Sequence, residues 1–507
     1  MPALRDYQQE MVHGVRASIQ AGHRRILVVS PTGSGKGTVI ANRARAIAAQ
    51  GRRCWVIAHR EEIVGDLSER IHAEGVPHGM IAAGFHEQPA QLVQVCSVDT
   101  LIRRLHRLQP PDVIVQDEAH HLVEDNKWGR VIEHSPRSFL IGFTATPERF
   151  DGKGLGAGHG GYFTDLVLGP TVGWLTDNGY LCPALAIVPP AVDLSSIAPG
   201  KLDTRAGLDA QGEILRQGEH MGDVVSNYLR SIACRHMGTA LSYTCSVPHA
   251  VTQADAFREA GIAAIAIDGN TDRGIRRQAF RDLADGSLKV LVNCEIATEG
   301  TDVPSVSGVI IDRRTKSLPL HLQMLGRGLR TADGKELAIF IDHVGNIGDG
   351  QGRTNLGMPA DPRNWSLEGR PKREAAHPEP DPHRNCPTCF ARTPSTSPVC
   401  TNCGYEFPIP QREEHEVERV DGDLVEFDPV KAAAMKAIEE ARRERISEER
   451  DCRSLEDFEA LGRQRGYKPG WALHRWKLRE KRRDPRRESW KQLSAAWSDP
   501  WEGHPLS

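Results

Sequence analysis

The sequence contains no apolar run that approaches the roughly 20 residues needed to cross a bilayer, and residues 1–9 lack the charged-then-apolar pattern of a secretion signal. It also has little net charge, because 64 lysines and arginines against 67 aspartates and glutamates leave −3 at pH 7. The bulk charge therefore gives no indication of a nucleic-acid partner, and any basic surface must be local. These absences predict an unexported, cytoplasmic protein without a membrane partner.

The cysteine pattern argues against a disulfide framework. Seven of the eleven cysteines are scattered singly, and the other four form two C-x-x-C pairs, Cys386 with Cys389 and Cys400 with Cys403. This distribution is typical of a reducing compartment combined with a metal site. Two such pairs can place four thiolates around one ion, for which Zn²⁺ in a structural role is the expected choice. Free cysteines, a redox pair or an iron centre are the alternatives.

The length of 507 residues is too great for one ordinary core and predicts two or three domains with tails. Short apolar runs alternate with longer amphipathic stretches, a pattern typical of parallel sheets covered by helices. These runs begin near residues 26, 54, 92, 112 and 139, and again near 239, 262, 288, 307 and 336. We therefore expect an α/β fold of two lobes, with connectors at residues 151–161 and 193–218.

Behind the lobes, a segment rich in Gly, Pro, Asn and Arg predicts an extended linker that leads to the cysteine pairs and then to a basic, partly helical tail. The predicted boundaries are 1–170 and 171–350 for the lobes, 351–384 for the linker, 385–407 for the zinc ribbon and 408–507 for the tail.

The first chemical motif is Ser30-Pro-Thr-Gly-Ser-Gly-Lys36, which follows an apolar strand and precedes a helical stretch. Glycines let backbone N–H groups face an anion, Lys36 would neutralise the β and γ phosphates, and the helix points its positive end at them. The alternative is a plain Gly-rich turn, which the flanking strand and helix disfavour. The residues expected at the nucleotide are Thr32, Gly33, Ser34, Gly35, Lys36, Gly37 and Thr38.

The residue after this lysine departs from the usual pattern. It is normally a Ser or Thr whose hydroxyl binds Mg²⁺, whereas this chain has Gly37 and places Thr38 one position later. Three outcomes stay open: Thr38 reaches the ion after a local shift, a water takes the place of the hydroxyl, or hydrolysis is impaired.

A second strand ends in Asp117-Glu118-Ala119-His120. Open α/β sheets bind their ligands at the carboxyl ends of their strands. We expect Asp117 to hold Mg²⁺ and Glu118 to orient the attacking water.

These motifs and their order resemble the DEAH-type superfamily 2 helicases over residues 4–330. The resemblance implies two tandem RecA-like lobes with an ATP site in the cleft between them, and ATP with Mg²⁺ as cofactors. In the first lobe it assigns Arg5 and Gln8 to the adenine, and it assigns His59, Arg60 and Thr100 to the nucleic-acid backbone. It assigns the coupling of the nucleotide site to strand movement to His120, Thr144 and Thr146.

The second lobe carries two further motifs of this family. Thr298-Glu-Gly300-Thr-Asp302 resembles motif V, which implies Gly300 and Asp302 at the nucleotide and Thr298 at the nucleic acid. Gln323-Met-Leu-Gly-Arg327-Gly-Leu-Arg330 resembles motif VI, whose catalytic set would be Gln323, Arg327 and Arg330. The i, i+3 spacing of the two arginines predicts one helical face that points across the cleft at the γ phosphate. A solvated helical face is the alternative for an arginine pair seen alone.

The predicted function is an ATP-dependent helicase or translocase. The run from Thr144 to Leu155 resembles phage and bacterial members related to excision-repair and restriction motors. That resemblance alone favours DNA over RNA, and it makes replication, repair or restriction proteins the expected partners. Two rivals remain: a duplex-translocating subunit of a restriction or recombination assembly, and a non-hydrolysing, ATP-gated binding or annealing protein, which Gly37 keeps open.

Overall fold

The computed structural model describes residues 4–124, 126–149, 152–235, 237–294, 306–348, 356–369 and 383–408, with residues 448, 452, 454–466, 470, 472–473 and 475–476 of the tail. Contacts divide the chain into two units: Ile409–Trp497 forms one, and the rest, which includes both lobes and the cysteine pairs, forms the other. None of the helices in these described segments is long and apolar enough to cross a membrane.

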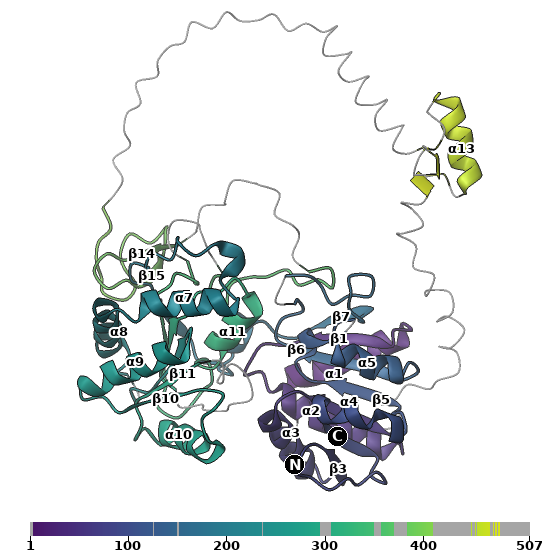
Figure 1. The fold of residues 1–507 in the computed structure, drawn as a ribbon, viewed down its shortest axis with the longest axis horizontal. Helices are drawn as coiled ribbons and strands as arrows, with labels where there is room; N and C mark the ends of the chain where they lie inside the picture. The colour runs from purple at the N-terminus through teal and green to yellow at the C-terminus, as the bar shows by residue number, and fades with distance from the viewer. Residues whose placement is uncertain are drawn as a thin grey trace, which may run out of the picture. The chain divides into compact units, whose positions relative to one another are not determined.

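The first lobe is a parallel sheet of seven strands in the order β3-β4-β2-β5-β6-β1-β7, drawn in purple and blue in Figure 1. Its strands are β1 (Arg25–Val29), β2 (Cys54–Ala58), β3 (His78–Ile81), β4 (Val93–Ser97), β5 (Val113–Gln116), β6 (Phe139–Thr144) and β7 (Asp165–Leu168). Its helices are α1 (Asp6–Gln20), α2 (Lys36–Ala49), α3 (Glu61–Ala73), α4 (Val98–Arg104) and α5 (Lys127–His134), with 3-10 turns η1 (Leu105–Arg107) and η2 (Ala119–His121). Helices α2 and α3 pack against each other, as α4 and α5 do.

The second lobe is a parallel sheet of six strands in the order β10-β11-β9-β12-β13-β8. Its strands are β8 (Ala184–Ile187), β9 (Ala240–Thr244), β10 (Ala264–Ile267), β11 (Val290–Asn293), β12 (Gly308–Asp312) and β13 (Ala338–Asp342). The helices are α6 (Val172–Asp177), which precedes β8, then α7 (Arg205–Leu215), α8 (Gly218–Ser231), α9 (Val247–Glu259), α10 (Arg273–Asp285) and α11 (Leu318–Gly326), with a 3-10 turn η3 (Pro199–Lys201). The predicted α/β fold with two parallel-sheet lobes is confirmed.

Burial explains which strands the sequence revealed. Strands β2, β4, β5, β6, β9, β11, β12 and β13 are buried along their whole length, so they form continuous apolar runs. The connector expected at residues 193–218 is in part wrong, because α7 forms there. Thr204 begins this helix, since its side chain accepts a hydrogen bond from the backbone N–H of Gly207.

The cysteine pairs belong to the second lobe rather than to a separate module. The ribbon strands β14 (His383–Asn385) and β15 (Arg392–Pro394) pair antiparallel, and Ala391 forms a bridge with Ile187 at the end of β8. Cys386, Ala391 and Cys400 lie in the same buried cluster as the core of this lobe. The ribbon thus covers the edge strand β8, which would otherwise be open to pairing with another chain.

Part of the expected linker returns to the first lobe. The backbone N–H of Gly357 donates to the carbonyl of Ile347 in the second lobe. A few residues later Trp365 and Leu367 pack against the core cluster of the first lobe, and the carbonyl of Leu367 accepts from the backbone N–H of Gly156. Residues 356–369 therefore form an interlobe strap, which an extended linker over 351–384 does not describe.

The described part of the tail unit is small. It contains α13 (Leu455–Gln464), which begins with a capping box between Ser454 and Asp457. Phe458 and Leu461 pack with Cys452, and Trp476 lies against this cluster.

Candidate active site

The phosphate loop leaves the first sheet at the edge where the other motifs end. Strands β5, β6 and β1 are neighbours in the sheet, and all of their carboxyl ends point the same way. Gly33 and Gly35 have φ angles of 86° and 81°, a left-handed conformation that only glycine adopts readily. The ammonium of Lys36 donates to the carbonyls of Ser30 (3.1 Å) and Pro31 (3.3 Å).

Charged groups from both lobes surround Lys36. Burial lowers its pKa, the carboxylates of Glu118 and Asp117 oppose that shift, and the guanidiniums of Arg327 and Arg330 add to it. A Cβ on Gly326 would lie 2.7 Å from the Cβ of Thr32, so the end of α11 approaches the phosphate loop closely. The structure therefore brings the predicted catalytic residues of the two lobes to one site.

The position after the lysine faces a guanidinium. A Cβ on Gly37 would lie 3.1 Å from both Cδ and Nε of Arg70, and Nη1 of Arg70 donates to Thr38 Oγ1 at 3.5 Å. Arg70 is itself paired with Asp66 on α3 at 2.7 Å. The hydroxyl of Thr38 thus contacts α3, and no sequence motif predicts this contact.

The acidic pair at the end of β5 is held by its own backbone. The N–H of Glu118 donates to Asp117 Oδ1 at 3.0 Å, and the N–H of Asp117 donates to the carbonyl of Ile57. Glu118 has a φ of 48°, a strained conformation for a residue with a side chain and one that is common at functional sites.

The three predicted coupling residues form one connected path. His120 Nδ1 lies 3.3 Å from Glu118 Oε2 and 3.2 Å from Thr144 Oγ1, and its ring is almost fully buried. Thr144 donates its hydroxyl to the carbonyl of Thr146 at 2.8 Å. A change at the Glu118 carboxylate can therefore reach the end of β6 through direct contacts.

The adenine-reading segment adjoins the phosphate loop. Gln8 donates from Nε2 to the carbonyl of Ser34 (3.2 Å) and accepts at Oε1 from the N–H of Arg5 (3.0 Å). The guanidinium of Arg5 lies 4.8 Å from the ring centre of Tyr180, a cation–π contact. Sequence reasoning missed Tyr180, although its closeness to Trp174 in a segment between the lobes was an available signal.

The motif VI arginines do not lie on a helix, so the prediction of a shared helical face is wrong. Helix α11 ends at Gly326, with Arg327 as its C-cap, and Arg330 comes directly after the turn at Arg327–Leu329. Glycines on both sides of Arg327 disfavour continuation of the helix. Gln323 lies within α11 and is buried.

Of the predicted nucleic-acid residues, His59 and Arg60 follow β2, and Thr100 lies in α4. Arg60 lines an interlobe cavity of about 640 Å³ together with Arg273 and Arg276 of α10. Two ion pairs span the lobes at this cavity: Arg273 with Glu61 (2.8 Å) and Arg276 with Glu62 (3.2 Å). Thr298, Gly300 and Asp302 lie outside the described residues.

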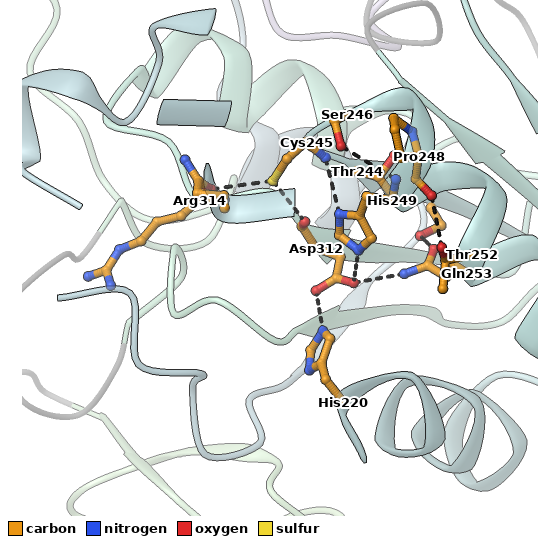
Figure 2. A network of polar contacts seen from close by, with 12 residues as sticks. His220, Thr244, Cys245, Ser246, Pro248, His249, Thr252, Gln253, Asp312 and Arg314 are labelled. Carbon is orange, nitrogen blue, oxygen red and sulfur yellow. Dashed lines mark hydrogen bonds and ion pairs between the residues drawn. The ribbon is translucent and has the colours of Figure 1, made fainter. Parts of the chain in front are cut away.

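A buried polar network supports the second lobe at the carboxyl ends of β9 and β12 (Figure 2). The Asp312 carboxylate lies 2.7 Å from His220 Nε2 and 3.0 Å from His249 Nε2, and it accepts from Gln253 Nε2 at 2.8 Å. Although burial opposes ionisation, the contacts with His220 and His249 hold the pKa of Asp312 well below its ordinary value. Sequence reasoning missed this network, because its members are scattered singly along the chain.

The four cysteines converge. Sγ of Cys386 lies 3.6 Å from that of Cys403, Sγ of Cys389 lies 3.6 Å from that of Cys400, and all four lie within 4.8 Å of one another. A tetrahedral zinc ion with Zn–S bonds of about 2.3 Å requires sulfur separations of roughly 3.8 Å. The backbone N–H of Asn402 also faces Cys400 Sγ at 3.4 Å, as suits a thiolate. The donor set therefore fits Zn²⁺.

Comparisons with known proteins agree with this architecture. The family model for the res subunit of type III restriction enzymes matches residues 1–149, and the model for the helicase conserved C-terminal domain matches residues 226–332. A 51.5 kDa protein of a Lactococcus phage is 30% identical over 406 residues, which are 78% of this chain and 81% of the phage protein.

Two further matches are more partial. A Saccharomyces cerevisiae protein named as an ATP-dependent helicase, IRC3, is 29% identical over 381 residues, which are 71% of this chain but only 54% of the yeast protein. Among solved structures, a fragment named as the HsdR subunit of a type I restriction enzyme from Vibrio vulnificus is 18% identical with a TM-score of 0.50. That match covers 68% of this chain and 64% of the fragment, and it supports the fold alone.

Two parallel-sheet lobes that meet at a phosphate loop define an ATP-hydrolysing motor of the helicase kind. The chain belongs to superfamily 2 of the helicases, in the branch related to the restriction motors. The family and the enzyme class predicted from the sequence are confirmed.

Proposed function

We propose that this motor acts on DNA, and that it couples ATP hydrolysis between its lobes to movement along a strand. The observation that carries this proposal is the meeting of Lys36, Asp117 and Glu118 from the first lobe with Arg327 and Arg330 from the second. A site built from both lobes is complete only when they close, so each cycle of binding and hydrolysis alternates closed and open states.

The roles of the residues follow from their positions. The N–H groups of the loop from Gly33 to Gly35 face the phosphates, and Lys36 neutralises their charge. Asp117 holds Mg²⁺, which supplies charge neutralisation when it is bound. Glu118 orients the attacking water and can take up its proton.

The remaining groups stabilise and transmit the reaction. Arg327 and Arg330 face the charge that develops on the transferred phosphoryl group. His120 contacts both Glu118 and Thr144, and it thereby links the reacting centre to the end of β6.

The nucleic-acid track is proposed to run past the interlobe cavity. His59 and Arg60, with Thr100 and Thr298 as further contacts, would face the phosphate backbone, and backbone contact carries no sequence information. DNA is favoured over RNA because the first lobe matches the model of a restriction-enzyme subunit, and restriction enzymes act on DNA. Partners in replication, repair or restriction are proposed on the same ground.

The test is steady-state ATP hydrolysis with single-stranded DNA, duplex DNA and RNA, for the native chain and for Lys36→Ala and Glu118→Gln. We expect stimulation by DNA and the loss of at least about 99% of turnover in both variants. Stimulation by duplex without strand separation in a displacement assay would select the duplex translocase. Binding of nucleic acid that depends on ATP but shows no turnover would select the ATP-gated binder, for which the engagement of Thr38 by Arg70 is the supporting observation.

We further propose that Cys386, Cys389, Cys400 and Cys403 hold one structural Zn²⁺. Elemental analysis of protein purified without chelator should give about one equivalent, and Cys400→Ser should lower that content. A content below about half an equivalent in the native chain would exclude the four-cysteine zinc site.

A further inference from the structure

The side chain of Lys335 contacts the segment from Arg327 to Arg330, which carries the two motif VI arginines. Because α11 ends at Gly326, the carbonyls that follow need hydrogen-bond donors from outside the helix. The ammonium of Lys335 donates to the carbonyls of Gly328 (2.7 Å) and Arg330 (2.8 Å). One charged group thus fixes the backbone on either side of the second arginine.

Lys335 reaches this position through a tight turn. Gly334 has a φ of 77°, and the N–H of Lys335 donates to the carbonyl of Ala332 at 3.0 Å. The side chain is directed inward, and only 7% of the residue remains exposed. Burial of a charged group is unfavourable unless its partners compensate, and here the two carbonyls of the turn are those partners.

A second contact holds the same turn from the segment between the lobes. The N–H of Cys182 donates to the carbonyl of Leu329 at 2.7 Å, and its thiol faces the carbonyl of Lys335 at 3.7 Å. The neighbouring Leu181 approaches the phosphate loop, since a Cβ on Gly33 would lie 2.8 Å from its Cδ2. The turn is therefore fixed in relation to the phosphate loop.

We propose that Lys335 is a positioning residue, which sets the turn from which Arg327 and Arg330 reach the nucleotide and so governs the rate of hydrolysis rather than ATP binding. This inference rests on the proposed roles of the two arginines. Lys335 acts on this segment through its backbone carbonyls. Displacement of a catalytic group by about 1 Å lowers rates by about a hundredfold, so a small change of this turn is sufficient.

Because Lys335 is charged, its role can be tested by the pH dependence of kcat, which a residue that only packs against the turn would not affect. Burial lowers the pKa of Lys335 to about 8, the adjacent Cys182 raises it and Arg330 lowers it. These two groups are the titratable neighbours, one from the segment before β8 and one from the turn after α11. As the pH rises through about 8, the ammonium loses its charge, the hydrogen bonds to the carbonyls weaken, and kcat should fall.

The experiment compares two variants of Lys335. Lys335→Met keeps the length of the side chain but loses the ammonium, and Lys335→Arg keeps the charge. Lys201→Met is the control, because Lys201 is an exposed lysine of the same lobe. For Lys335→Met we expect kcat to fall by about tenfold to a hundredfold, while KM for ATP changes less than about threefold. Lys335→Arg should retain more activity and lose the decline of kcat near pH 8.

A double-mutant cycle connects Lys335 with the arginines. If the lysine acts through Arg330, then Lys335→Met combined with Arg330→Ala should be no slower than Arg330→Ala alone. The inference would be overturned if the losses of kcat in the two single variants multiply in the double variant. It would also be overturned if kcat of Lys335→Met equals that of Lys201→Met. If Lys335→Met has a strongly lowered unfolding midpoint, its loss of kcat is not informative, and the pH dependence of kcat for Lys335→Arg is used instead. A pH dependence of Lys335→Arg equal to that of the native chain would overturn the inference.

Failure of the proposed function has a different signature. If Arg327→Ala and Arg330→Ala leave kcat unchanged, or if the native chain shows no turnover, the arginine roles fail and the inference fails with them. If both arginine variants lose activity while Lys335→Met does not, only the inference about Lys335 fails.

Discussion

The glycine after the phosphate-loop lysine departs from the usual pattern of the motif. A hydroxyl there would normally bind Mg²⁺, yet Gly37 leaves the space to the side chain of Arg70, and the hydroxyl of Thr38 accepts a hydrogen bond from Arg70 of α3. Arg70 is about one-third exposed and flexible, so it can move aside for a larger residue. The site could therefore hold a larger residue than Gly37, and the main effect of the glycine is that no hydroxyl is present at this position.

We predict that Gly37→Thr increases the affinity for Mg²⁺. The introduced hydroxyl would add one ligand beside Asp117, so half-maximal ATP turnover should require about threefold to tenfold less Mg²⁺. The measurement is ATP hydrolysis as a function of Mg²⁺ concentration, and Gly37→Ala is the matched control because it adds the Cβ without the hydroxyl. Equal Mg²⁺ dependence in the two variants would contradict the prediction.

At single positions, the sequence predicted the residues that belong to continuous motifs. Asp117, Glu118 and His120 come just after β5, Lys36 begins α2 after the loop that follows β1, and the order of the strands brings them to one edge. Lys335 could not be predicted, because its role depends on a turn that replaces the expected helix after Gly326.

Among the elements, α8, α9 and β12 meet at one buried carboxylate. His220 lies on α8, and although burial opposes its protonation, Asp312 and then Asp223 raise its pKa above the ordinary value. Its ring also lies edge-on to that of His343 at 5.4 Å. Burial lowers the pKa of His343 to about 4, so this second ring is neutral at pH 7.

We predict that the stabilisation which His220 gives to the second lobe is lost as the pH rises above the ordinary histidine range. A raised pKa in the folded state means that the stabilisation by His220 is complete below about pH 6.5 and is lost as the pH rises through the folded pKa. Urea unfolding of the native chain and of His220→Gln between about pH 6 and pH 8.5 would measure this loss, as a difference in the free energy of unfolding that becomes smaller as the pH rises. The comparison removes the opposite contribution of His343, whose lowered pKa adds stability as the pH rises through the ordinary histidine range. Asp312 does not contribute to the pH dependence in this range. Because its pKa is lowered, the stabilisation by its carboxylate is lost only in acid.

The strands show which elements a sequence can reveal. All ten apolar runs form strands, whereas β3, β7 and β8 were missed, and these three lie at sheet edges with partly exposed side chains. Strand β3 contains His78 and Gly79 and β7 begins with Asp165, so neither gives a continuous apolar run, whereas β8 is apolar throughout and was overlooked. Helix α7 was missed because the stretch around it shows no strong apolar period.

At the scale of the whole molecule, the first lobe is not complete without residues that follow the second. The interlobe strap alternates in burial, with Trp365 and Leu367 partly buried against the core and Ser366 and Glu368 exposed. The strap also approaches Gly154 and Gly156 so closely that a Cβ on either would lie within 3 Å of the carbonyl oxygen of Leu367. This return could not be predicted from the sequence, because the strap has too few apolar residues to form a recognisable strand.

We predict that Trp365→Ala lowers the free energy of unfolding of the first lobe by about 2 to 3 kcal/mol, because a large apolar side chain is removed from a packed site. Leu367→Ala should act in the same direction, and Ser366→Ala is the control on the exposed side of the strap. Urea unfolding followed by tryptophan fluorescence reports the change, with circular dichroism for the variant that lacks Trp365. Stability equal to that of Ser366→Ala would show that the strap does not belong to this core.

The strap also limits how far the motor can open. Gly357 is held on the second lobe and Trp365 on the first, so the backbone between them has eight residue steps and spans at most about 28 Å when fully extended. The segment before β8 already joins the lobes, and the chain passes between them again to reach the ribbon. A mechanical load on one lobe is therefore transmitted to the other along several covalent connections. Exchange of lobes between two copies of the chain would require the strap to detach first.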